Sequence, residues 1–133
     1  MKSGRKKNLI AVISGIVAGV ATVFVVESIG HMIYPPPADI DLSNKEDMKR
    51  LMSVMPLGAK VSVTLAWLAG SFVAAATTLK LSAGNKKASW IPVVFLLLAG
   101  IATMFSFPHP GWMIVAGITL PLIGGWLAQK LFA

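Results

Sequence analysis

The chain has 133 residues, of which 56% are hydrophobic and 13% are charged, whereas a soluble domain has about 25% charged residues. This composition excludes an ordinary soluble domain and indicates a protein built into a membrane. The sequence contains no cysteine, which excludes a disulfide-stapled fold, a thiolate metal site and a cysteine nucleophile.

Four long apolar segments follow one another along the chain. Each contains a run without Asp, Glu, Lys, Arg or His that is long enough to cross the hydrocarbon core as a helix. The runs are apolar on every face instead of alternating, which excludes a β-barrel. We therefore expect a single all-α membrane domain over residues 1–133, a polytopic bundle of four transmembrane helices. The helices are predicted at about residues 9–33, 57–80, 88–107 and 110–131.

The net charge of the chain is +7, and eight of its twelve Lys and Arg residues gather on one predicted side of the membrane. Lys and Arg are enriched in cytoplasmic loops of membrane proteins, so this side is expected to be cytoplasmic, together with both termini. The bilayer, and not nucleic acid, is then the expected partner of the basic residues. They are Lys2, Arg5, Lys6, Lys7, Lys80, Lys86, Lys87 and Lys130.

The connection between the first two helices, residues 34–56, is long and lies on the outer side in this orientation. Tyr34 is followed by three prolines, which favour an extended exit from the bilayer. Ser43 and Glu46 form a capping-box pattern, and apolar residues then recur at helical spacing until a proline ends the run. The pattern predicts a short amphipathic helix at about residues 44–55, with an apolar face made by Met48, Leu51, Met52 and Met55.

Small residues recur at about four-residue spacing in three of the predicted helices. Such stripes let transmembrane helices approach closely, because lipid offers no hydrophobic drive for their association. We expect them to pack the four helices within one chain. Packing between chains, in a homo-oligomer or against a partner membrane subunit, is an open alternative. The stripes are Ala11, Gly15 and Gly19; Ser62, Ala66, Gly70, Ala74 and Thr78; and Gly117 and Gly125 around Pro121.

Glu27 is the sole acidic residue within or beside a predicted transmembrane helix. A carboxylate at membrane depth is costly, so it normally faces the bundle interior and pairs with another group or takes up a proton. His31 follows one turn later on the same helix face, and Lys60 and His109 are predicted at the same outer level. With Tyr34 one turn above His31, these residues predict a polar cluster or ligand-binding site at the outer face.

Three interpretations of this cluster remain open. In the first, Glu27 and Lys60 form an ion pair, and the protein is a structural, lipid-contacting or accessory subunit. In the second, Glu27 carries a proton or cation in a small transporter. In the third, Glu27, His31 and His109 bind a metal ion at the outer face. We expect the first interpretation, and with it no catalytic residue, no enzymatic activity and no cofactor.

Three stretches of the chain resemble a group of small, uncharacterised bacterial four-helix membrane proteins, in which the exit from the first helix reads Glu-x-x-Gly-His-x-x-Tyr-Pro-Pro-Pro. The resemblance covers most of the chain and implies a bacterial inner-membrane protein without naming a reaction. In size and in the Glu on its first helix, the chain also looks like the small multidrug resistance transporters. Those proteins place the carboxylate nearer the membrane middle and lack a long proline-led loop. The stretches are Glu27, Gly30, His31 and Tyr34 to Pro37; Met55 to Gly58; and Pro108 to Trp112.

Overall fold

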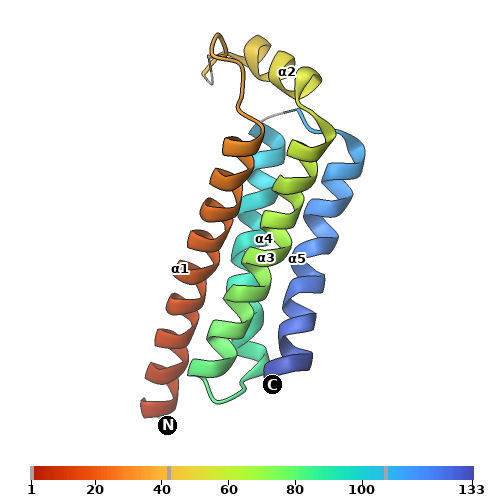
Figure 1. The fold of residues 1–133 in the computed structure, drawn as a ribbon. Coiled ribbons are helices and arrows are strands. Elements are labelled where there is room, and N and C mark those ends of the chain that lie inside the picture. Colours follow the sequence, from red (N-terminus) through yellow and green to blue (C-terminus); the bar gives the residue numbers. More distant parts are fainter. Residues whose placement is uncertain (1, 42, 107) are drawn as a thin grey trace.

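The predicted transmembrane segments and the loop helix are all helical in the computed structural model (Figure 1), which describes residues 2–41, 43–106 and 108–133. Four of the helices are long and apolar enough to cross a membrane, namely α1, α3, α4 and α5. The expected all-α fold, a four-helix bundle of a multi-pass membrane protein, is therefore confirmed. The helices are α1 (Lys2–Ile33), α2 (Lys45–Val54), α3 (Leu57–Leu81), α4 (Lys86–Ser106) and α5 (Gly111–Phe132).

Two helices extend beyond the apolar runs that predicted them. α1 begins at Lys2 instead of about residue 9, and α4 begins at Lys86 instead of about residue 88. Lys and Arg are good helix formers, so the basic residues next to an apolar run continue the helix into the polar region. The predicted end of the third transmembrane helix, at residue 107, lies outside the described residues.

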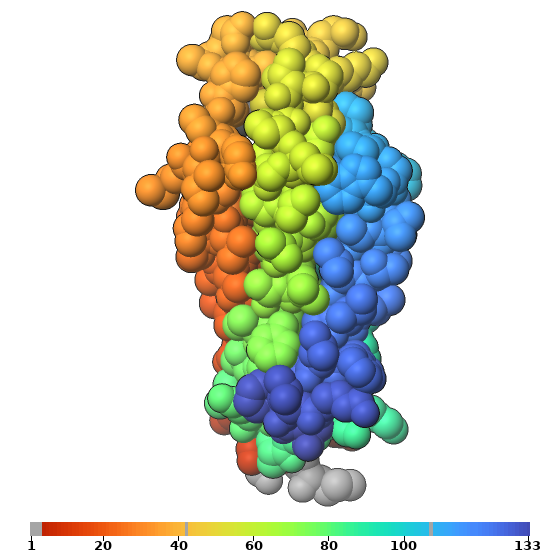
Figure 2. Space-filling model, turned by 45° about the vertical axis from the view of Figure 1, so that its right-hand side comes forward, coloured from red at the N-terminus to blue at the C-terminus, as the bar shows by residue number. Residues whose placement is uncertain are grey.

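The two termini lie at one end of the bundle, and α2 lies across the other end (Figure 1). We call these the terminal end and the α2 end. The central helix is α3, which packs against α1, α4 and α5. Figure 2 shows it between α1 and α5 on one face of the molecule. Any cavity between the helices is therefore lined on one side by α3.

Small residues set the register between the antiparallel helices α1 and α3. A Cβ atom on Gly15 would overlap the Thr78 side chain and lie 2.7 Å from the carbonyl oxygen of Ala74. The Thr78 hydroxyl donates hydrogen bonds to the carbonyls of Ala74 and Ala11. These stripes pack within the chain, as expected from the sequence. The facing pairs down the interface are Gly30 with Ser62, Gly19 with Ala74, and Gly15 with Thr78.

The half of the bundle toward the terminal end is tightly filled. A fully buried cluster joins α3, α4 and α5 there, and Trp90 packs against it. A Cβ atom on Gly125 would lie 2.8 Å from the Trp90 ring, so α5 is in close contact with α4. This half therefore closes the interior of the bundle toward the termini. The buried cluster consists of Ala75, Leu79, Val93 and Ala128.

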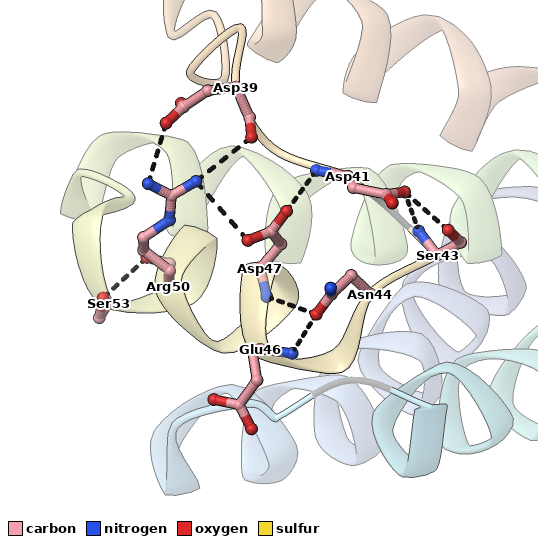
Figure 3. A network of polar contacts seen from close by, with 8 residues as sticks. All are labelled: Asp39, Asp41, Ser43, Asn44, Glu46, Asp47, Arg50 and Ser53. Carbon is pink, nitrogen blue, oxygen red and sulfur yellow. Dashed lines mark hydrogen bonds and ion pairs between the residues drawn. The ribbon is translucent and has the colours of Figure 1, made fainter.

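Polar contacts hold α2 to the loop that precedes it (Figure 3). The Arg50 guanidinium donates to the Asp39 carboxylate at 2.9 Å and lies 3.6 Å from Asp47. The predicted capping role of Ser43 is wrong. Asn44 caps α2, because its side-chain oxygen accepts from two backbone amides of the first turn. Ser43 instead donates to the Asp41 carboxylate through its hydroxyl and its backbone amide.

The Asp39 and Asp41 contacts predict that acid loosens this loop. The side-chain hydrogen bond from Arg50 lowers the pKa of Asp39 below its ordinary value of 3.8, and the side-chain hydrogen bond from Ser43 lowers that of Asp41. A lowered pKa in the folded state means that the ionised form stabilises the loop above pH 3.8, and that this contribution is lost as the pH falls through the folded-state pKa. We expect hydrogen exchange in residues 35–56, corrected for its intrinsic pH dependence, to accelerate below pH 4.

The matched control for this pH effect is Arg50→Met at neutral pH. This variant removes the donor to Asp39 without changing the charge of either aspartate. The loop should then exchange faster at pH 7, and its remaining response to acid should be smaller than in the wild type. Equal pH responses in the two proteins would show that the Arg50 contact is not the cause.

Candidate functional site

A cavity of about 350 Å³ lies among α1, α3, α4 and α5, in the half of the bundle toward the α2 end. It extends from His109, in the turn between α4 and α5, to Ser71, which is fourteen residues along α3 from its first residue. At 1.5 Å per residue the floor is therefore about 21 Å from the α2 end of that helix. Its walls are apolar except for Glu27, Ser71, Thr103, His109 and the Trp67 ring nitrogen, and they contain no Lys or Arg.

Glu27 is half-buried and lines this cavity from α1. In the part of the chain that the structure describes, the Glu27 carboxylate has no hydrogen bond and no ion pair, so the expected pair with Lys60 does not form. The register explains the difference. Gly30 faces Ser62, so Glu27 is level with Leu65, and Lys60 lies about 7.5 Å nearer the α2 end at 1.5 Å per residue.

His31 and Tyr34 belong to a second cavity, of about 270 Å³, beneath α2. The Tyr34 ring packs against Gly58 at the start of α3, where a Cβ atom would overlap it. The second cavity is otherwise apolar, and its remaining lining consists of Pro35, Pro36, Pro37, Leu51, Val54, Met55 and Pro56. The single polar cluster predicted from the sequence is therefore divided. Glu27 and His109 share one cavity, His31 and Tyr34 share the other, and Lys60 lines neither.

The metal-site interpretation is not supported by this arrangement. Among residues 2–41, 43–106 and 108–133, no three His, Asp or Glu side chains come together as a metal site. His31 remains within electrostatic range of Glu27, four residues away on α1. Because His31 lies in the cavity beneath α2 and His109 in the cavity of Glu27, the three expected ligands do not converge.

Aromatic rings form one wall of the larger cavity. The rings of Trp67 and His109 lie with their centroids 6.5 Å apart and their planes at 46°. The Trp67 ring also fills the space beside Gly117 on α5, where a Cβ atom would lie 2.8 Å from it. Trp67 is thus held between α5 and the turn that carries His109, and it presents an aromatic surface to the cavity.

Ser71 is a site residue that the sequence did not reveal. Its side chain is fully buried at the cavity floor, and its hydroxyl has no hydrogen-bond partner among the described residues. The sequence feature that could have indicated it is the position of the Ser71 hydroxyl, one turn after Trp67 and next to the small-residue stripe of α3. That signal was weak, because a serine in a transmembrane helix commonly donates to a carbonyl of its own helix.

The larger cavity combines a carboxylate from α1, an aromatic wall and a buried hydroxyl from α3. With a carboxylate and no Lys or Arg side chain in its lining, it is suited to a cation and disfavours an anion. Its volume is at the lower end of the range for small-molecule sites, which favours a small ligand. Comparisons with protein-family models, with curated proteins and with solved structures find no match for this chain.

Proposed function

We propose that the protein is a small carrier that binds a proton or a small cation at Glu27 within the membrane. The observation that supports this proposal is the position of Glu27. It is a half-buried carboxylate that lines a cavity and has no ion-pair partner among the described residues. An intramembrane carboxylate is costly when it has no counter-charge, and such residues mark ion pathways in many membrane proteins. No catalytic step and no cofactor are part of the proposal.

The orientation that we propose follows from charge. Arg5, Lys6, Lys7 and the lysines at the inner ends of the other helices lie at the terminal end, which we place in the cytoplasm. The cavity of Glu27 then lies in the outer half of a bacterial inner membrane. Tight packing of α1 against α3 around Gly15 closes it toward the cytoplasm. Carriers commonly hold their cargo near the membrane middle, and the cavity extends from Glu27 toward that depth.

The purely structural interpretation loses its main support, because it depended on an ion pair between Glu27 and Lys60. A lipid-contacting surface is still part of our proposal. The helices expose large apolar side chains around the bundle, including Phe24 at 72% and Phe105 at 89%. Bilayer lipid, a second copy of the chain or another membrane subunit would cover these faces.

Glu27→Gln tests the carrier proposal. We expect proton flux into vesicles containing the purified variant to fall to the rate of protein-free vesicles, because the titratable group is removed. Thermal stability in detergent should be unchanged or higher, because a carboxylate without a counter-charge is replaced by a neutral amide. Flux is measured with a pH-sensitive dye inside the vesicles under an imposed membrane potential.

Glu46→Gln is the matched control, because Glu46 is an exposed acid on α2 outside the cavity. This variant should retain both flux and stability. If Glu27→Gln retained wild-type flux and lost stability instead, Glu27 would be a structural residue and the carrier proposal would be rejected.

A further inference from the structure

Among the described residues, Ser71 carries the one fully buried side-chain hydroxyl without a hydrogen-bond partner. Most hydroxyls elsewhere in the described parts of the membrane-spanning helices donate to a carbonyl of their own helix, as in Thr64, Thr78 and Thr103. Ser14 and Thr77 make no such bond, but both are only partly buried. Ser71 is as buried as Thr78, but its oxygen makes no such bond. A buried polar group without a partner in a native protein calls for an explanation. Because Ser71 lines the cavity, a bound molecule can supply the missing partner.

The register between α1 and α3 gives the separation of Ser71 from Glu27. Gly30 faces Ser62, and Gly19 faces Ala74, so the register between the two helices is nearly constant along their contact. Glu27 is therefore level with Leu65, and Ser71 lies six residues deeper. At 1.5 Å per residue, the Cα atom of Ser71 is about 9 Å farther from the α2 end than that of Glu27. One ligand that reaches both groups must be elongated along the bundle axis.

The surface between these two polar groups is apolar and aromatic. Trp67 is one turn from Ser71 on α3, and its ring lines the same cavity. Flat apolar bodies pack well on an indole, and a cation above its face is also attracted by the ring quadrupole. The other walls between these levels come from Val23, Phe24, Ala99 and Gly100. The middle of the cavity therefore suits a hydrocarbon or aromatic body, and not a second charge.

We propose that the cavity binds an elongated organic amine whose ammonium group pairs with Glu27, whose apolar body lies against Trp67, and whose far end hydrogen-bonds Ser71 through a hydroxyl. The inference rests on the proposed function, because it names the class of cation for the same cavity. It adds a requirement that charge alone does not impose, namely a hydrogen-bonding group at the end opposite the ammonium. Tyramine has this form, with a ring between a hydroxyl and an ammonium group.

Three probes separate the two polar contacts. Tyramine carries both end groups, phenethylamine lacks the hydroxyl, and para-ethylphenol lacks the ammonium. Binding of each to the full chain in lipid nanodiscs is measured by calorimetry. We expect tyramine to bind about five- to tenfold more tightly than phenethylamine, as is typical for one net hydrogen bond. Ser71→Ala should abolish this preference without weakening phenethylamine binding.

Two further variants complete the design. Ser106→Ala removes an exposed hydroxyl of α4 that bonds to its own helix and does not line the cavity, so it should bind all three probes as the wild type does. Glu27→Gln should weaken both amines and leave para-ethylphenol unchanged. The ligand-free thermal stability of Ser71→Ala should equal or exceed that of the wild type, because a buried hydroxyl without a partner is removed.

The outcomes distinguish this inference from the proposed function. Equal binding of the two amines, or a tyramine preference that survives Ser71→Ala, overturns the inference, while amine binding that still depends on Glu27 keeps the carrier proposal. Absence of amine binding together with Glu27-dependent proton flux also overturns the inference alone. Amine binding that is insensitive to Glu27→Gln overturns both. A loss of ligand-free stability in Ser71→Ala would assign the hydroxyl a structural partner and reject its role in binding.

Discussion

Gly15→Ala is expected to lower the free energy of unfolding by about 2 kcal/mol, within the range for overpacking a close contact. The added Cβ would overlap the Thr78 side chain and lie 2.7 Å from the backbone carbonyl oxygen of Ala74. Thr78 can turn away only by giving up its hydrogen bonds to Ala11 and Ala74. The Ala74 carbonyl belongs to the α3 backbone, so α1 and α3 must move apart. Unfolding in mixed micelles of increasing SDS content measures the effect.

Gly100→Ala is the matched control, because it makes the same change in the interior of a transmembrane helix. A Cβ atom at Gly100 has no neighbour within 4 Å. Alanine is the better helix former by about 1 kcal/mol in peptides, so this variant should be as stable as the wild type or more stable. If Gly15→Ala lowers the free energy of unfolding and Gly100→Ala raises it, the loss of stability at Gly15 comes from the contact between α1 and α3. A loss of equal size at both positions would contradict that assignment.

The transmembrane helices were predictable because their signal is local. An apolar run of sufficient length has to form a helix in lipid, where every backbone polar group needs a partner. The stripe of Gly15 and Gly19 likewise predicted a close helix contact, since only small residues allow one. The sequence did not say that α3 would be the partner, although Ala74 and Thr78 carried a matching pattern.

The site was harder to predict, because it depends on the register between helices. Glu27 and Lys60 were both expected at the outer end of the bundle, and a separation of about 7.5 Å along the axis was enough to prevent their pairing. His31 is four residues from Glu27 on α1, yet it lines the cavity beneath α2. The sequence marked Ser71 only weakly, by its position one turn after Trp67. Its missing hydrogen bond is visible only when every nearby donor and acceptor has been placed.

Gly100→Leu is expected to block the cavity of Glu27 while the bundle stays folded. Gly100 lines the cavity from α4, and a Cβ atom there would have no neighbour from the rest of the bundle within 4 Å. A leucine there would place its side chain against the cavity interior, in the space that we assign to the ligand. Leucine also has a higher helix propensity than glycine, so the substitution should not destabilise the α4 backbone. We expect both Glu27-dependent proton flux and tyramine binding to fall to background.

Gly4→Leu provides the comparison for this last substitution. Gly4 is an exposed residue of α1 at the terminal end, and a Cβ atom there also meets nothing within 4 Å. The variant changes the same residue type in a helix but leaves the cavity open, so flux and binding should match the wild type. If Gly100→Leu remained as active as Gly4→Leu, with both proteins folded by their SDS unfolding curves, the cargo would have to pass outside this cavity. Glu27 would then act from another face of α1, and the route between the four helices would be excluded.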